Sequence, residues 1–178
     1  MNDDLGATAY VILGMLGLGA KTGYDIKGIV DQSTRFFWAA SYGQIYPELR
    51  RLEQAGLVKG ELAPTGGRKR RVYELTPAGR RALADWAASP PRMPELRDEN
   101  LLKLFFADAL PREQALEQLR MRRLGHEQFL AILKEIEARP GEEPPFVDLV
   151  LHYGIEYAQF NIDWCKRHEQ RLAKKEAA

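Results

Sequence analysis

The spacing of apolar residues predicts three helices in the first third of the chain. Apolar positions recur every three or four residues over residues 6–18, 22–32 and 41–55, as they do on a helix with one buried face. Thr22 has the type and position of an N-cap for the second helix. Ser41 and Gln44 form a capping-box pattern at the start of the third, and Gly56 provides its C-terminal stop.

After Gly56 the apolar residues recur at every second position, as in a strand, instead of every three or four. Residues 57–62 predict a short strand, residues 70–75 alternate basic or acidic with apolar side chains, and residues 64–67 (PTGG) supply the turn between them. Thr76 and Pro77 then provide the N-cap and first residue of a fourth helix, which ends near residue 88. Three helices, a hairpin and a helix predict a winged helix-turn-helix domain over residues 1–88.

A proline-rich segment divides the chain after this domain. Residues 89–94 contain three prolines, which a helix interior does not tolerate, so we assign residues 89–97 to an elbow. Residues 98–174 read as helical throughout. Asp98 caps a short helix, and Pro111 begins a long one to about residue 138 with these inner positions: Leu116, Leu119, Phe129, Leu130, Leu133 and Ile136. The predicted fold class is mainly α, with a C-terminal helical, coiled-coil-like dimerisation domain.

The last predicted helix carries a stripe of large apolar residues. They recur at intervals of four and three positions: Phe146, Val150, Tyr153, Tyr157, Phe160 and Trp164. This is the heptad spacing of helices that pair along a seam. Two interpretations are open: the stripe pairs two copies of the chain, or part of it packs within one chain against the helix at residues 112–138.

Composition narrows the class of protein. With 45% hydrophobic and 29% charged residues the chain can fold around a core, and its apolar runs are shorter than the roughly 20 residues of a membrane span. The acidic residues Asp3 and Asp4 stand where a secretory signal carries basic ones. Cys165 is the sole cysteine, so no internal disulfide can form. These features predict a protein of the cytoplasm.

The formal net charge of +1 conceals a basic segment. Residues 41–81 contain nine Lys and Arg against four Asp and Glu. A local excess of positive charge favours a polyanionic partner. In a helix-turn-helix the third helix enters the major groove of DNA, and a basic hairpin reaches the backbone or the minor groove. The candidate DNA-binding residues are polar, basic or aromatic: Thr22, Tyr24, Lys27, Ser41, Tyr42, Gln44, Tyr46, Arg50, Arg51, Arg68, Lys69 and Arg70.

No catalytic or metal-binding pattern accompanies this basic segment. Residues 14–22 (GMLGLGAKT) resemble a phosphate-binding loop, but Ala20 separates the lysine from the last glycine and no strand precedes the loop. Cys165 and His168 share a face of the last helix, yet two ligands do not make a zinc site. We expect no enzyme activity, metal or cofactor. A small helical enzyme that uses Cys165 is a further hypothesis.

Four blocks of sequence carry a family resemblance. They are residues 10–16 (YVILGML), 22–27 (TGYDIK), 41–58 (SYGQIYPELRRLEQAGLV) and 71–79 (RVYELTPAG). In this order they closely resemble the PadR family of bacterial transcriptional regulators. The resemblance covers about residues 8–88, and the later helices are similar, by pattern only, to the dimerisation region of the longer PadR subgroup. It implies a homodimeric winged helix-turn-helix repressor that binds a palindromic promoter site.

The same resemblance raises the expectation of a small aromatic effector. Effectors across the family include phenolic acids and drug-like aromatic compounds. Side chains that could stack on a ring and hold a polar substituent are Tyr10, Trp38, His152, Tyr153 and Trp164. Ordinary core and interface packing needs no ligand and is the favoured interpretation for any one of these residues.

The alternative function is that of an adaptor. Some winged helices bind a protein partner rather than DNA, and a solvated basic face is compatible with either. The dependence of affinity on salt separates them, because neutralising DNA phosphates releases counterions and an apolar protein interface does not.

Overall fold

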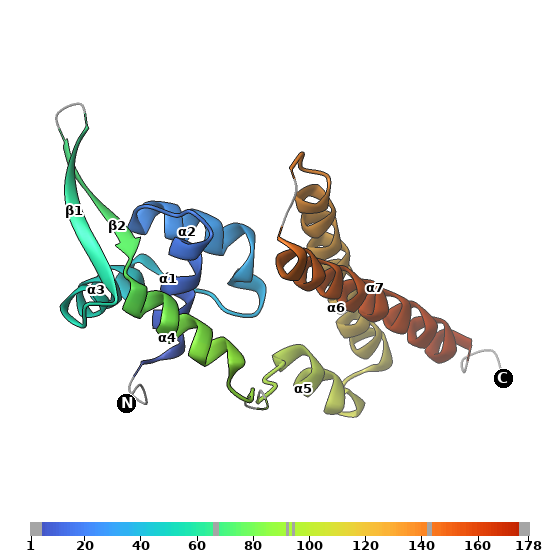
Figure 1. The fold of residues 1–178 in the computed structure, drawn as a ribbon. Coiled ribbons are helices and arrows are strands. Elements are labelled where there is room, and N and C mark those ends of the chain that lie inside the picture. The colour runs from blue at the N-terminus through green and yellow to red at the C-terminus, as the bar shows by residue number, and fades with distance from the viewer. Residues whose placement is uncertain (1–4, 66–67, 92, 94, 142–143, 175–178) are drawn as a thin grey trace. The chain divides into compact units, whose positions relative to one another are not determined.

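A computed structural model describes residues 5–65, 68–91, 93, 95–141 and 144–174. The chain divides into two compact units, residues 1–92 and 93–178 (Figure 1). Within the described ranges, no helix combines the length and the apolar character needed to span a membrane.

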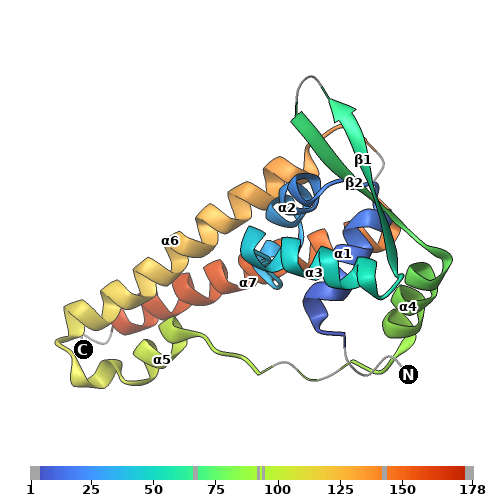
Figure 2. The same cartoon turned by 90° about the vertical axis from the view of Figure 1, so that its left-hand side faces the viewer.

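The first unit is a winged helix-turn-helix, as predicted. Its elements are α1 (Ala7–Gly17), α2 (Gly23–Gln32), the 3-10 turn η1 (Thr34–Phe36), α3 (Tyr42–Gln54), β1 (Val58–Thr65), β2 (Arg68–Leu75) and α4 (Pro77–Ala88). The two strands pair antiparallel from Val58 opposite Leu75 to Thr65 opposite Arg68. Figures 1 and 2 show this hairpin, the wing, projecting beyond the helices.

The strands of the wing are longer than the sequence pattern indicated. Pro64 and Thr65 belong to β1, and Arg68 and Lys69 belong to β2. The predicted turn is therefore wrong in extent, and residues 66–67, which connect the strands, lie outside the described ranges. Pro64 is tolerated in β1 because a strand of a two-stranded sheet has a free edge, where a missing amide hydrogen leaves no ladder bond unmade.

The core of this unit lies between α1, α2, α3 and the base of the wing. Its fully buried large side chains are Ile12, Leu13, Ile26, Val30, Ile45, Leu49, Leu52 and Val58. At the start of α4, a Cβ on Gly79 would lie 2.0 Å from the carbonyl oxygen of Leu57, so this close approach requires glycine. The Thr76 hydroxyl accepts the Gly79 amide (3.0 Å) and donates to the Gly56 carbonyl (2.8 Å). The predicted cap is confirmed.

The second unit is a pair of long helices with a short helix against it. It comprises α5 (Glu99–Phe105), the turn η2 (Ala107–Ala109), α6 (Arg112–Glu137) and α7 (Pro145–Lys174). α6 and α7 lie side by side (Figures 1 and 2). Two contacts show that they run antiparallel: Arg122 binds Asn161, and Leu133, further along α6, lies near Gly154, earlier in α7. Asp98 caps α5 as predicted, accepting the Leu101 amide at 3.0 Å.

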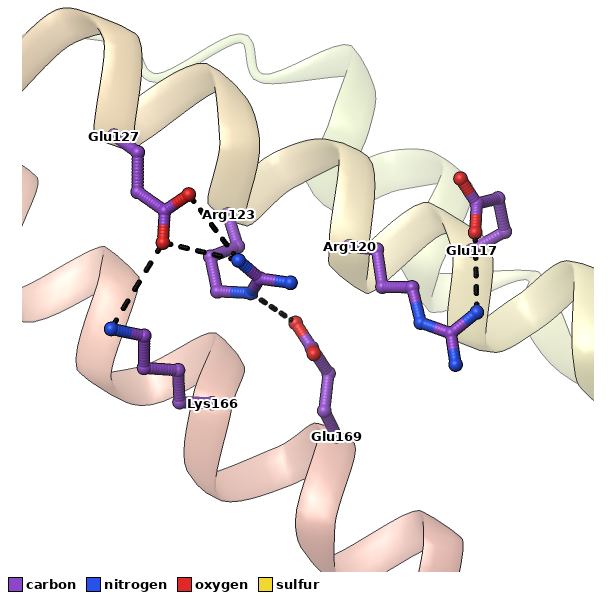
Figure 3. A network of polar contacts seen from close by, with 6 residues as sticks. All are labelled: Glu117, Arg120, Arg123, Glu127, Lys166 and Glu169. Carbon is purple, nitrogen blue, oxygen red and sulfur yellow. Dashed lines mark hydrogen bonds and ion pairs between the residues drawn. The ribbon is translucent and has the colours of Figure 1, made fainter.

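Ion pairs along one edge fix the register of α6 against α7 (Figure 3). Arg123 of α6 donates to Glu169 of α7 (2.9 Å) and to Glu127 one turn further along α6 (3.1 Å). Lys166 of α7 lies 4.0 Å from the same Glu127 carboxylate. Isolated surface pairs add little stability, but this network joins four charged groups at one level of the helix pair.

The aromatic stripe of α7 is largely exposed, but part of it packs within the chain. The Tyr157 ring lies 5.6 Å from the His126 ring of α6, centroid to centroid, and Trp164 lines a cavity together with residues of α6. Phe146 is 81% exposed, Tyr153 70% and Phe160 61%. Another stripe with spacing of three and four contacts α6: Ile155, Ala158, Ile162 and Cys165. Small residues allow the two helix backbones to approach closely, since a Cβ on Gly154 would already lie 3.1 Å from Leu133.

Candidate nucleic-acid interface

One face of α3 is exposed while the opposite face is in the core. Ile45, Leu49 and Leu52 point inward, at helical spacing. The outward residues are the predicted candidates Tyr42, Gln44, Tyr46, Arg50 and Arg51, all of which are exposed. The helix therefore presents aromatic, amide and guanidinium groups together, which suits contacts with base edges and phosphates.

Three tyrosines form a continuous aromatic surface across α2 and α3. The ring centroids of Tyr24 and Tyr42 are 6.5 Å apart, and those of Tyr42 and Tyr46 are 6.1 Å apart. Lys27 places its ammonium 5.8 Å from the centre of the Tyr42 ring, and it also pairs with Asp31. Tyr46 lies directly on the backbone of α2, where a Cβ on Gly23 would be 2.6 Å from its ring. Gly23 thus fixes where the tyrosines stand.

Gln44 caps the start of α3. Its side-chain oxygen accepts hydrogen bonds from the Ser41 amide and the Ser41 hydroxyl, both at 3.0 Å. A bidentate contact with adenine needs both the oxygen and the nitrogen of the amide group. With the oxygen engaged by the cap, the side-chain nitrogen of Gln44 is the group left to contact a base.

The exposed arginines of α3 differ in their surroundings. Arg51 pairs with Glu48 one turn earlier (3.3 Å). Arg50 has no carboxylate partner within the described part of the chain. Its guanidinium is therefore the one on this helix that can bind an anion without first leaving an internal ion pair.

Two further predicted DNA-binding residues, Thr22 and Arg70, are engaged within the protein. Thr22 is only 4% exposed, and its hydroxyl caps α2 by accepting the Asp25 amide at 3.1 Å. Arg70 of β2 donates to both oxygens of Asp25 (2.9 and 3.0 Å) and to the Thr22 hydroxyl (3.2 Å). The position of Thr22 therefore corrects its assignment as a direct contact. The side chains of Arg68 and Lys69 lie outside the described part of the structure.

The charge on Asp25 is stabilised in this arrangement. Burial acts to raise the pKa of its carboxyl, but the contacts with Thr22 and the Lys21 amide and the charge of Arg70 together lower the pKa below its usual value. Asp25 is thus ionised at neutral pH and holds the Arg70 guanidinium.

The five candidate effector residues are distributed over both units. Tyr10 is in the core of the first unit and stacks on Trp86 with centroids 4.6 Å apart, whereas Trp38 is exposed in the same unit. In the second unit, His152 and Tyr153 are exposed, and the His152 ring contacts the Asp148 carbonyl (3.0 Å). Trp164 lines a cavity within the second unit.

That cavity is about 410 Å³ in volume and lies between η2, α6 and α7. Leucines and alanines form most of its wall, the ring centroids of Trp164 and His168 are 4.5 Å apart, and Asp108 and Arg112 supply charged groups. The role of His168 and Asp108 could not be predicted from local patterns, because their approach depends on how α7 packs. Within the described ranges, no cluster of His, Cys, Asp or Glu could hold a metal ion.

Comparisons with known proteins agree with this architecture. Residues 12–85 match the Transcriptional regulator PadR-like family, and residues 96–173 match the Virulence activator alpha C-term family. The negative transcriptional regulator PadR of Bacillus subtilis is 36% identical over 108 residues, which are 60% of this chain and 59% of that protein.

Solved structures extend the similarity over nearly the whole chain. Bacillus subtilis PadR in complex with operator DNA superposes with a TM-score of 0.84 at 28% identity, covering 94% of this chain and 99% of that one. The same protein in complex with p-coumaric acid gives 0.77 at 28% identity over the same shares. The Vibrio cholerae virulence activator AphA gives 0.70 at 31% identity, covering 95% and 98%.

Proposed function

Because this chain belongs to the PadR-like family of transcriptional regulators, we propose that it is a repressor that binds palindromic promoter DNA as a homodimer in the cytoplasm. The observation that carries the proposal is the exposed face of α3, where Arg50 and the tyrosine surface stand beside Gln44. Bacillus subtilis PadR, whose fold this chain shares, binds operator DNA.

The proposed contacts are of two kinds, to base edges and to the phosphate backbone. Arg50 and Gln44 read base edges in the major groove, whereas Tyr24, Lys27 and Tyr42 orient the domain on phosphates. The remaining contributors are Ser41, Tyr46 and Arg51 at the start and along the face of α3. Arg68 and Lys69 reach the backbone or the minor groove from the tip of the wing. In this scheme residues 1–88 bind DNA and residues 89–97 are the elbow.

Residues 98–174 form the proposed dimerisation domain. The outward stripe of α7 leaves large aromatic side chains exposed, and Leu102 and Phe105 of α5 and Phe106 directly after it are also exposed. We assign these side chains to a protein interface, because monomeric proteins rarely expose an extended apolar surface. A second copy of the chain would cover it and would place two α3 helices in successive major grooves, which are about 34 Å apart.

Selection from a pool of random DNA duplexes tests the proposal. We expect purified protein to enrich a palindromic site, and log K for that site to fall linearly with log salt concentration at about −0.9 per phosphate contacted. Absence of an enriched site would contradict the repressor proposal. Salt-independent capture of a protein partner would then support the adaptor.

We further propose that a small aromatic compound regulates the protein from the cavity at Trp164. A relative of the same fold binds p-coumaric acid. The cavity of about 410 Å³ falls within the size range of small-molecule sites, and its apolar wall with a few polar groups is typical of them. Trp164 and His168 would stack on the ring of the ligand.

A further inference from the structure

The basic run at the end of the wing contains two arginines that face in opposite directions. Successive side chains of a strand point to opposite sides of the sheet. Arg70 of β2 turns towards α2, where it binds Asp25 and Thr22. Arg71 turns towards α3, where it binds Glu53 at 2.5 Å. Adjacent residues of one strand therefore attach the wing to both helices of the helix-turn-helix.

Backbone contacts strengthen the attachment to α2. The amide of Tyr73 donates to the carbonyl of Lys21 at 2.8 Å, across the turn that precedes α2. Asp25 accepts from the Lys21 amide (3.2 Å) as well as from Arg70. A single carboxylate thus holds the start of α2 and the guanidinium from β2.

The attachment to α3 has a matching form. Glu53, near the end of α3, accepts from Arg71 and from the amide of Gly60 in β1 (3.2 Å). A Cβ on Gly60 would lie 2.7 Å from the Glu53 carboxylate oxygen and 2.8 Å from the Arg71 side-chain nitrogen. Glycine at this position leaves room for the ion pair to close over the strand.

We propose that Arg70 and Arg71 are positioning residues that hold the wing at a fixed angle to α2 and α3, and that neither binds a DNA phosphate. A phosphate would have to compete with carboxylates that already accept two or more hydrogen bonds each. The inference rests on the proposed function, since the position of the wing matters for DNA contact. It replaces the prediction that Arg70 belongs to the DNA-binding set.

Amide hydrogen exchange in the free protein tests the attachment without DNA. The Tyr73 amide reports the α2 attachment and the Gly60 amide reports the α3 attachment. We expect Asp25→Asn and Arg70→Gln each to speed exchange of the Tyr73 amide by about two- to fivefold, the range for partly exposed ion pairs. The double variant Asp25→Asn/Arg70→Gln should exchange the Tyr73 amide no faster than either single variant, because both substitutions remove the same ion pair. Arg50→Gln, which removes an equal charge from α3, should change neither amide.

Salt dependence of operator binding tests the second half of the proposal. Lys69→Ala, at a residue proposed to reach the phosphate backbone, should reduce the salt slope by about 0.9, as the loss of one phosphate contact does. Arg70→Gln should lower affinity at every salt concentration and leave the slope unchanged. A loss of about 0.9 in the slope for Arg70→Gln would overturn the proposal.

Exchanging the charges of the α3 attachment gives the sharpest readout. Arg71→Glu should weaken operator binding on the order of tenfold, because a negative charge is introduced and the ion pair is lost. Combining it with Glu53→Arg restores an ion pair of reversed polarity, and we expect most of the affinity to return. A phosphate-binding arginine could not be rescued in this way, so persistent weakness of the double variant would refute the assignment.

The experiments separate this inference from the proposed function. If the wild-type protein binds no DNA but Asp25→Asn and Arg70→Gln still speed exchange at Tyr73, the attachment stands and the repressor proposal fails. If the variants leave exchange at Tyr73 unchanged while the wild-type protein binds its operator, the positioning role fails and the repressor proposal stands.

Discussion

Arg122 is a charged side chain in the interior of the second unit, where it joins three helices. Only 8% exposed, it donates to Asp98 before α5 (2.8 Å), to Asn100 (3.2 Å) and to Asn161 of α7 (2.8 Å). The Asn161 amide in turn donates to the Tyr157 carbonyl at 2.9 Å. Burial of this charge is tolerated because every partner is a hydrogen-bond acceptor.

Replacing Arg122 should therefore destabilise the second unit. We expect Arg122→Met to lower the free energy of unfolding by about 2–4 kcal/mol, since it leaves Asp98 and Asn161 without their partner. Arg120→Met, two positions earlier on α6, is the matched control. Its guanidinium lies 3.4 Å from Glu117 on the surface, and its loss should cost less than about 0.5 kcal/mol. Denaturant unfolding measures both, and equal costs would contradict the role of Arg122.

Gln44 combines a helix cap with a proposed base contact, and two variants separate the roles. Gln44→Ala removes both, so we expect a loss of about 0.5–1 kcal/mol in stability and relaxed base preference. Gln44→Glu keeps the acceptor for the Ser41 amide but loses the donor, so it should retain stability and still lose discrimination. In the wild type only the side-chain nitrogen of Gln44 is free to contact a base. The loss of this single contact should reduce discrimination by an amount near the lower end of about 1–3 kcal/mol.

The measurement is a competition between operator and random DNA, together with thermal unfolding. Lys69→Ala serves as the comparison, since a residue that contacts phosphate weakens binding to all sequences alike. If both Gln44 variants lost equal affinity for operator and random DNA, Gln44 would be a cap alone.

At the scale of elements, α7 carries two stripes with different tasks. The small and aliphatic stripe packs on α6, and most side chains of the aromatic stripe are exposed. Tyr157 touches both regions, because its ring meets His126 of α6 with centroids 5.6 Å apart. Substitutions intended to test assembly should therefore avoid Tyr157 and use the most exposed members of the stripe.

We expect Tyr153→Glu combined with Phe160→Glu to give a folded monomer with little affinity for the operator. Two carboxylates at an apolar interface are costly to bury, while the α6–α7 contact is untouched. Analytical ultracentrifugation gives the mass, and circular dichroism checks the fold. Gln170→Glu, at an exposed position of α7 outside the stripe, is the control and should leave the mass unchanged. A double variant that remained a dimer of full affinity would disprove the proposed interface.

The junction of α5, α6 and α7 also predicts a dependence on pH. Burial acts to raise the pKa of Asp98, but hydrogen bonds from the Leu101 amide and Arg122, and the charge of Arg122, lower the pKa overall. A carboxyl with a lowered pKa in the folded state stabilises the fold above its unfolded pKa, roughly 3.9. This contribution is lost as the pH falls from about 4 through the lower folded value.

Asp98→Asn keeps a good N-cap but removes the charge. We expect it to be about 1–2 kcal/mol less stable than the wild type at pH 7, with the difference shrinking as the pH falls below about 4. Unfolding by urea at several pH values measures this difference. A gap of constant size down to the lowest pH would contradict the assigned role of the ion pair.

At the scale of the whole molecule, regulation requires that a ligand bind two states of the protein unequally. A ligand with equal affinity for the DNA-binding and the released state shifts nothing. A compound in the Trp164 cavity, which lies wholly within the second unit, must therefore act on DNA binding through the dimer or through the elbow at residues 89–97.

We expect p-coumaric acid, or another planar aromatic acid, to quench tryptophan emission and lower operator affinity over the same concentration range. Both quantities are measured in one titration. Trp164→Leu should abolish both effects, whereas Trp38→Leu, which changes an exposed ring in the first unit, should preserve the effect on DNA. Quenching without any change in affinity would indicate a site that is not regulatory.

Local patterns in the sequence determined the elements of both units. The caps at Thr22, Thr76 and Asp98 and the boundaries of the helices could be predicted because they depend on residues within a few positions of each other. The basic segment was equally visible, since formal charge needs no structure. The winged helix-turn-helix followed from the order of these elements.

Tertiary structure alone decided which of the charged and apolar groups are available. Arg70 is held by Asp25, which is 45 positions away, and Arg122 is buried against Asn161, 39 positions away. Heptad spacing predicted a seam on α7 but not its direction, because α7 has two stripes of suitable period and only the small residues of one let α6 approach closely. Ion pairing and close packing depend on distances between remote segments, which no local pattern specifies.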